Sequence, residues 1–124
     1  MANHNSAGPA SKYLCERLFE ELEKRLGLLT YEQGENKCSI KGAGSVFAWI
    51  ASHAKEYGSI NVWFYGDAND AMDFKKLTIY KRSSLAGEWK RYASSFHLRH
   101  KKQLPEAVEL VSTISYPKSL KTSQ

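Results

Sequence analysis

Short segments with the composition of β-strands fill the middle of this chain, and short loops join most of them. The firmest segment, Ile60–Tyr65, is rich in β-branched and aromatic residues and lies between Gly58 and Gly66. Parallel neighbours would need a crossover connection of about a dozen residues or more. We therefore expect a mainly antiparallel sheet.

Further strand patterns lie on both sides of this segment. Lys37–Lys41, Phe74–Arg82 and Tyr92–Lys101 show the period of two that is typical of strands. Val46–Tyr57 fits a helical stripe as well as a buried strand, and we interpret it as a strand. The sequence thus predicts four to five strands, with the polar segment Thr30–Asn36 outside them.

Two amphipathic helices flank the strands in chain order. Ser11 is the expected N-cap of the first helix and Gly27 its expected C′ stop. Pro105 suits the first turn of the second helix, which Pro117 limits. The first helix has leucines at intervals of four residues, at Leu14, Leu18, Leu22 and Leu26. We predict an α+β fold with both helices packed on one face of the sheet.

The chain of 124 residues has room for one domain, and that length can bury a core without disulfide or metal staples. Its hydrophobic fraction of 42% and charged fraction of 25% are those of a globular protein rather than a disordered one. We expect a flexible lead-in over residues 1–10, a single domain over residues 11–117, and a polar tail over residues 118–124.

The cysteines and the N-terminal residues bear on localisation. Cys15 and Cys38 lie in different expected elements and form no CxxC pair, so neither a disulfide framework nor a zinc ribbon is predicted. Met1–Pro9 lacks an apolar signal region, and no stretch approaches the ~20 apolar residues that span a bilayer. We expect a cytoplasmic protein with no membrane contact.

Positive charge is concentrated in the second half of the chain. The formal net charge is +5, yet the segment Lys75–Lys102 holds nine Lys and Arg residues against Glu88 alone. From Ser11 to Glu35, six acids face four bases. One region therefore carries the whole excess, and a partner of opposite charge would meet the protein there.

Six short segments follow one another in a fixed order along the chain. They are Leu18–Leu22, Cys38–Lys41, Val46–Ile50, Ile60–Phe64, Phe96–Arg99 and Leu104–Tyr116. In this order they resemble DUF5655, a family of small domains of unknown function. The resemblance implies a compact helix–sheet–helix domain, found alone or appended to proteins of nucleic-acid defence and restriction systems, with no established catalytic motif.

The basic region is the candidate binding site. Its cations would neutralise phosphates and release counterions, while exposed Trp89, Tyr80 or Tyr92 would stack on unpaired bases. The other interpretation is a solvated sheet face that keeps the protein soluble and discourages edge pairing. The candidate nucleic-acid-binding residues are Lys75, Lys76, Lys81, Arg82, Trp89, Lys90, Arg91, His97, Arg99, Lys101 and Lys102. Strand alternation would place four of them on one face: Arg91, His97, Arg99 and Lys101.

No metal site is predicted. Asp67–Asp73 clusters oxygen ligands, but Met72 and Thr78 stand where a calcium-binding EF-hand loop needs Gly and Glu, so we expect a turn. His97 and His100 are three residues apart on an expected strand, which points their side chains to opposite faces.

Other motifs favour structural roles. Gly42–Ser45 lacks the third glycine of a dinucleotide loop and the lysine of a P-loop, so a hairpin turn is expected. Trp49 and Trp63 lie in apolar runs and are expected in the core. A catalytic pair of Cys15 or Cys38 with a histidine stays open, although no nucleophile motif surrounds either cysteine.

The sequence predicts a small non-catalytic binding module that contacts nucleic acid or another polyanion through a basic sheet face. The alternative is a protein-interaction or self-assembly module, whose exposed aromatics and sheet edge would dock a partner or a second copy. An enzyme or ligand-binding domain would need a deep pocket with groups of perturbed pKa, and no motif for one is present. No cofactor is predicted.

Overall fold

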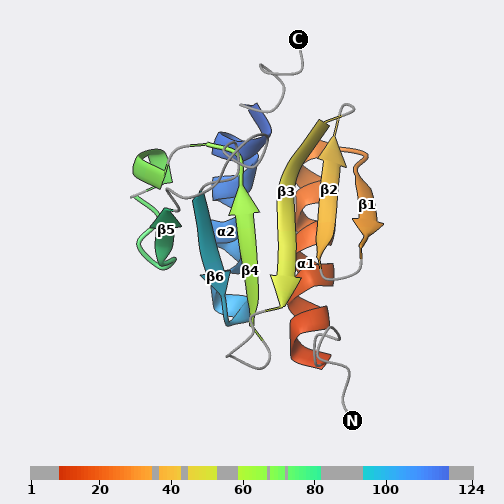
Figure 1. Cartoon of the computed structure of the whole chain (residues 1–124), viewed down its shortest axis with the longest axis horizontal. Coiled ribbons are helices and arrows are strands. Elements are labelled where there is room, and N and C mark those ends of the chain that lie inside the picture. Colours follow the sequence, from red (N-terminus) through yellow and green to blue (C-terminus); the bar gives the residue numbers. More distant parts are fainter. Residues whose placement is uncertain are drawn as a thin grey trace.

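The computed structural model describes residues 9–34, 37–42, 45–52, 59–66, 68–71, 73–81 and 94–117. The predicted α+β architecture is confirmed: an antiparallel sheet packs against two α-helices (Figure 1). The helices and strands are α1 (Pro9–Leu26), β1 (Thr30–Gln33), β2 (Cys38–Gly42), β3 (Ser45–Ser52), β4 (Ile60–Phe64), β5 (Ile79–Lys81), β6 (Ser94–Leu98) and α2 (Leu104–Leu110). Three short helical segments complete the order: η1 (Ala68–Ala71), η3 (Lys101–Gln103) and η4 (Val111–Ser115).

The sheet has six strands in the order β1-β2-β3-β4-β6-β5, and every neighbouring pair is antiparallel. The prediction of four to five strands was too low because β1 was missed. All four side chains of β1 are exposed, so the strand shows no apolar alternation that a sequence could reveal. The interpretation of Val46–Tyr57 as a strand is confirmed as far as Ser52, and residues 53–58 lie outside the described residues.

Helix α1 begins at Pro9, so the assignment of Ser11 as its N-cap was wrong. Proline is tolerated in the first helical turn because its missing N–H would have no intrahelical partner there. The helix ends as predicted before Gly27, whose φ of 94° lies in the left-handed region that glycine adopts without a Cβ clash.

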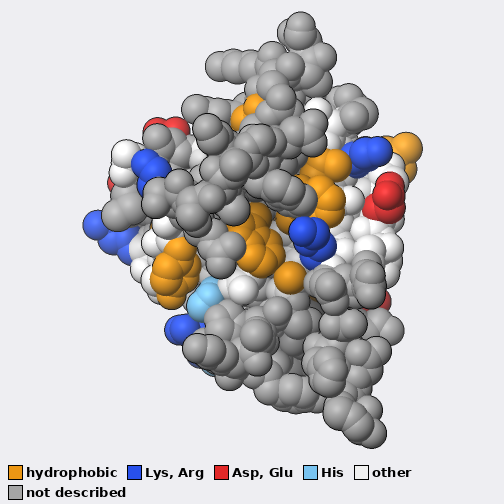
Figure 2. Space-filling view, viewed as in Figure 1, with side chains coloured by type: hydrophobic (Ala, Val, Ile, Leu, Met, Phe, Trp, Pro, Cys, Tyr) orange, Lys and Arg blue, Asp and Glu red, His pale blue; other side chains and the backbone are white. Residues whose placement is uncertain are grey.

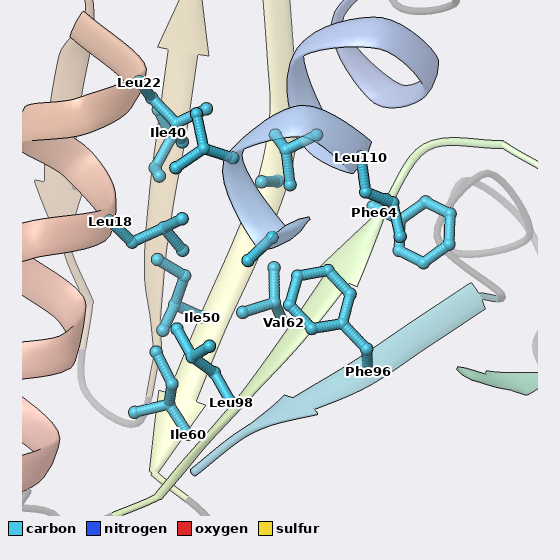
Figure 3. Close-up of a cluster of buried hydrophobic side chains, with 14 of the residues drawn as sticks. Leu18, Leu22, Ile40, Ile50, Ile60, Val62, Phe64, Phe96, Leu98 and Leu110 are labelled. Atoms are coloured by element: carbon cyan, nitrogen blue, oxygen red, sulfur yellow. The ribbon is translucent and has the colours of Figure 1, made fainter. Parts of the chain in front are cut away.

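The core lies between the sheet and the two helices, which lie behind the sheet in Figure 1. Ile60, Val62 and Phe64 alternate along β4 and are almost completely buried. Figure 3 shows Leu18 and Leu22 of α1 meeting the sheet side chains from the helix layer. Burying one such leucine fully stabilises the fold by ~1.5–3 kcal/mol.

We call the opposite side of the sheet, which faces the viewer in Figure 1, the front face.

Two strands are shorter than predicted. Within the described part of Phe74–Arg82, which ends at Lys81, only Ile79–Lys81 forms a strand, because the chain before it turns. The amide of Phe74 donates to the carbonyl of Ala71 at 3.1 Å, and the amide of Leu77 donates to the carbonyl of Phe74 at 3.1 Å. The buried side chain of Leu77 therefore belongs to a turn and not to a strand. The second segment, predicted over Tyr92–Lys101, contributes Ser94–Leu98, and residues 82–93 lie outside the described residues.

The closing helix forms as predicted, with Pro105 in the first turn of α2. It continues as the wider π-helical segment η4. Leu104, Val108 and Val111 are buried along the helix, as its apolar spacing predicts. No helix in the described part of the chain is long and apolar enough to cross a membrane.

Ser115 fastens this closing segment to the centre of the sheet. Its side chain is completely buried. The hydroxyl donates to the carbonyl oxygen of Phe47 in β3 and accepts a hydrogen bond from the amide of Tyr65, at 2.8 Å, just after β4. One side chain thus satisfies one backbone group in β3 and another in the residue that follows β4.

Ser115→Ala should lower the free energy of unfolding by ~1–3 kcal/mol, because it leaves two backbone polar groups without a partner. Ser112→Ala is the matched control, since Ser112 Oγ is buried in the same segment and has no hydrogen-bond partner among the described residues. That change should leave stability unchanged or raise it. Urea unfolding followed by circular dichroism measures both variants. Equal losses in the two variants would contradict the anchoring role of Ser115.

Candidate nucleic-acid interface

The structure describes seven of the eleven predicted nucleic-acid-binding residues. Those that the structure describes are Lys75, Lys76, Lys81, His97, Arg99, Lys101 and Lys102. The others, Arg82, Trp89, Lys90 and Arg91, lie outside the described residues, as does Tyr92. The candidate interface therefore consists of residues from the described set.

Exposed cations gather at one corner of the sheet, where β5 begins and β6 ends. The side chain of Gln103 holds this corner together. Its Oε1 accepts hydrogen bonds from the amides of Arg99, at 2.7 Å, and His100, at 3.1 Å. Its Nε2 donates to the carbonyl oxygen of Lys76 at 2.9 Å. The five cations, which we call the basic corner, are Lys75, Lys76, Arg99, Lys101 and Lys102, and all are exposed.

Local turn chemistry explains why the chain folds this way at Gln103. The amide of Gln103 donates to the carbonyl of His100 at 2.9 Å and closes the short helix η3. The Gln103 side chain bonds back to the His100 amide, as glutamine does three residues into a helix. Glu106, one turn later, accepts a hydrogen bond from the amide of Lys76 at 3.3 Å. Gln103 was not among the residues predicted from the sequence, because His100 at the N-cap does not give the usual capping-box signature.

The strand that was predicted to carry the basic sheet face ends earlier than expected. Strand β6 ends at Leu98, so Arg99 and Lys101 follow the strand instead of alternating along it. The physical reason is the turn at Gln103, whose side-chain Oε1 accepts hydrogen bonds from the amides of Arg99 and His100. His97 does lie on the front face, opposite Asn61 of β4.

Lys81 lies apart from the basic corner. It pairs with Ser94 at the end of β5, whereas the corner surrounds the beginning of that strand.

Charges at the basic corner differ from those of the helix layer. Arg17 pairs with Glu20 at 3.2 Å, and Arg25 of α1 pairs with Glu109. Within the described residues, Lys75, Lys101 and Lys102 form no ion pair. Uncompensated lysines on one surface produce a positive potential that attracts anions.

Two tryptophans that were expected in the core lie on the front face. Along β3 the chain turns Ile50 toward the helices and Trp49 away from them, and β4 does the same with Val62 and Trp63. Both indole side chains are half-buried. Figure 2 shows hydrophobic side chains gathered over β3 and β4 on this face. The apolar runs hid this arrangement, but the polar Asn61 marks the same side of β4 as Trp63.

A groove of about 630 Å³ lies between α1 and α2, lined in part by Leu104, Pro105 and Val108. Ion pairs hold most of the charged side chains at its rim, and Lys101 of the basic corner lines the same groove. The hydrogen bond from Arg25 holds the pKa of Glu109 below its ordinary value, and Lys24 lowers the pKa of Glu21 in the same way. Both pKa shifts arise from ion pairs at the surface. They therefore indicate a structural network rather than a general acid or base.

The hydroxyl of Tyr31 contacts the thiols of both cysteines, between α1 and the first two strands. Cys15 Sγ lies 3.0 Å from Tyr31 Oη, and the Tyr31 hydroxyl donates to Cys38 Sγ at 2.8 Å. The Cys38 thiol donates in turn to Oε1 of Gln33 at 3.1 Å. Burial raises the pKa of Cys15 to about 11, although the hydrogen bond with Tyr31 lowers it. A thiol with so high a pKa is a poor nucleophile.

The two motifs that were weighed as metal ligands lie in different parts of the fold. Among the described residues, no group of three His, Cys, Asp or Glu side chains is placed to hold a metal ion. The aspartate-rich loop forms η1 over Ala68–Ala71. His97 lies within β6 and His100 beyond its end, so they do not share the strand that was expected. Gly42 pairs with Ser45 across β2 and β3, which fits the predicted hairpin.

Comparisons of this chain with family models, with curated proteins and with solved structures found no match. The resemblance to DUF5655 therefore stays a prediction.

The raised pKa of Cys15 predicts how stability depends on pH. The unfolded chain releases the thiol proton near the ordinary value of 9.0, whereas the folded chain retains it up to about 11. The free energy of unfolding should therefore fall as the pH rises from 9 to 11. Cys15→Ala is the control, because its stability should fall less over this interval. Urea unfolding at several pH values compares the two proteins, and parallel pH profiles would show that Cys15 does not contribute.

Proposed function

We propose that this protein is a non-catalytic module that binds nucleic acid through its basic corner. The observation that carries the proposal is the joining of Lys75–Lys76 to Arg99–Lys102 by the side chain of Gln103. These segments lie far apart in the sequence, so their exposed cations would otherwise be spread around the domain.

The chemistry of the corner suits phosphate groups. Exposed lysine and arginine side chains neutralise phosphates and release condensed counterions, which gives affinity for any sequence. Lys102 is exposed and follows Lys101 directly in η3, so both ammonium groups project from one short turn. The family resemblance supports the same function, because it implies an association with nucleic-acid defence proteins.

Replacing Lys102 with glutamate should weaken binding to all nucleic-acid sequences alike and reduce the slope of log affinity against log salt by about one. Lys24→Glu is the matched control, because it makes the same charge change on α1, where the Lys24 side chain is 70% exposed. That variant should keep the slope of the parent protein. The measurement is fluorescence anisotropy of labelled DNA and RNA strands, titrated at low and near-physiological salt.

Two results would count against the basic corner. Absence of binding at low salt would reject nucleic acid as the partner and favour the protein-interaction module. Equal losses in Lys102→Glu and Lys24→Glu would mean that the net charge of the whole protein, and not this corner, drives association.

A further inference from the structure

A row of aromatic side chains crosses the front face from β3 to β5. Trp49 lies directly opposite Trp63, and Ser95 of β6 lies opposite both Trp63 and Tyr80. Neighbouring strands are about 4.8 Å apart, so the three steps from β3 to β5 span roughly 14 Å. Tyr80 is 41% exposed, and both indoles are half-buried. We call Trp49, Trp63 and Tyr80 the aromatic row.

Cationic groups stand at both ends of the aromatic row. The ammonium of Lys37 lies 5.4 Å from the ring centroid of Trp49. At the other end, the ring centroids of Tyr80 and His97 are 4.9 Å apart. Nη2 of Arg99 lies 3.5 Å from Nδ1 of His97. Because Arg99 belongs to the basic corner, the corner adjoins the Tyr80 end of the row.

The charge of the front face limits the class of ligand. The strands β2 to β6 contain no Asp or Glu, and the one carboxylate in the sheet is Glu32, in the edge strand β1. In Figure 2 blue Lys and Arg side chains appear beside the hydrophobic side chains of this face. A surface of flat π systems flanked by cations complements a ligand that has both flat rings and negative charge.

Single-stranded nucleic acid has both features. Its unpaired bases offer flat faces to aromatic side chains, while its phosphates meet lysine and arginine. In a duplex the bases stack on one another, so their faces are not available to the protein.

We propose that the aromatic row stacks on unpaired bases, so that the ligand of this protein is single-stranded nucleic acid rather than duplex. This inference rests on the proposed function, because the basic corner would hold the phosphates of the same strand. The protein contacts the bases by stacking, which predicts little sequence preference.

Removing the bases from the ligand tests this inference. The experiment compares labelled oligothymidine with an abasic strand that has the same number of phosphates, by anisotropy at low salt. Stacking predicts that oligothymidine binds at least about tenfold more tightly. Equal affinities would overturn the inference while leaving the proposed function in place. If neither strand binds, the proposed function itself fails. A duplex of the same length that binds more tightly than oligothymidine would also overturn the inference.

Variants of the aromatic row locate the stacking. Trp63→Leu should weaken oligothymidine binding about tenfold and leave the affinity for the abasic strand unchanged. Tyr13→Leu, on α1, is the control, because Tyr13 is similarly exposed at 46% but belongs to the helix layer. If Trp63→Leu fails to fold by circular dichroism, Tyr80→Leu provides the same comparison from an exposed position. A loss that is equal for both strands would overturn the stacking role.

Discussion

The packing of α1 and the closing helix against the same face of the sheet is the constraint on which the rest of this structure depends (Figure 1). It divides each central strand into alternate residues that meet the helices and alternate residues that cannot. Val62 and Phe64 take the first role, and Trp63 takes the second. Ser115 fixes the closing helix to β3 and to the end of β4, and so holds this division in place.

Two kinds of side chain define the candidate interface, and different parts of the fold position them. The aromatic row depends on strand register, since Trp49 and Trp63 are direct partners across β3 and β4. The basic corner depends on a turn, since Gln103 holds the chain after β6 against the segment before β5. Stacking and phosphate contact are complementary requirements for binding an unpaired strand. The front face and its corner supply both within one sheet.

The sequence predicted the elements whose patterns are strong and failed where contacts between distant segments decide. The strand Ile60–Phe64 and the stop at Gly27 follow from composition and backbone preference, and the structure has both. Strand β1 was missed because its four exposed residues give no apolar alternation. Trp63 was misplaced because apolar residues occupy both faces of β4, so hydrophobicity alone does not distinguish them. The basic corner depends on a hydrogen bond across 27 positions, from Gln103 to Lys76, which no local pattern contains.

The most direct test of this account is a nuclear magnetic resonance titration of the isotopically labelled protein with oligothymidine. The account predicts shifts of the Trp49 and Trp63 indole resonances and of amides in β4, β5 and η3, because these residues form the aromatic row and the basic corner. Amides of α1, on the other side of the sheet, should stay in place. Shifts confined to the groove between α1 and α2, with unchanged indole resonances, would contradict the account.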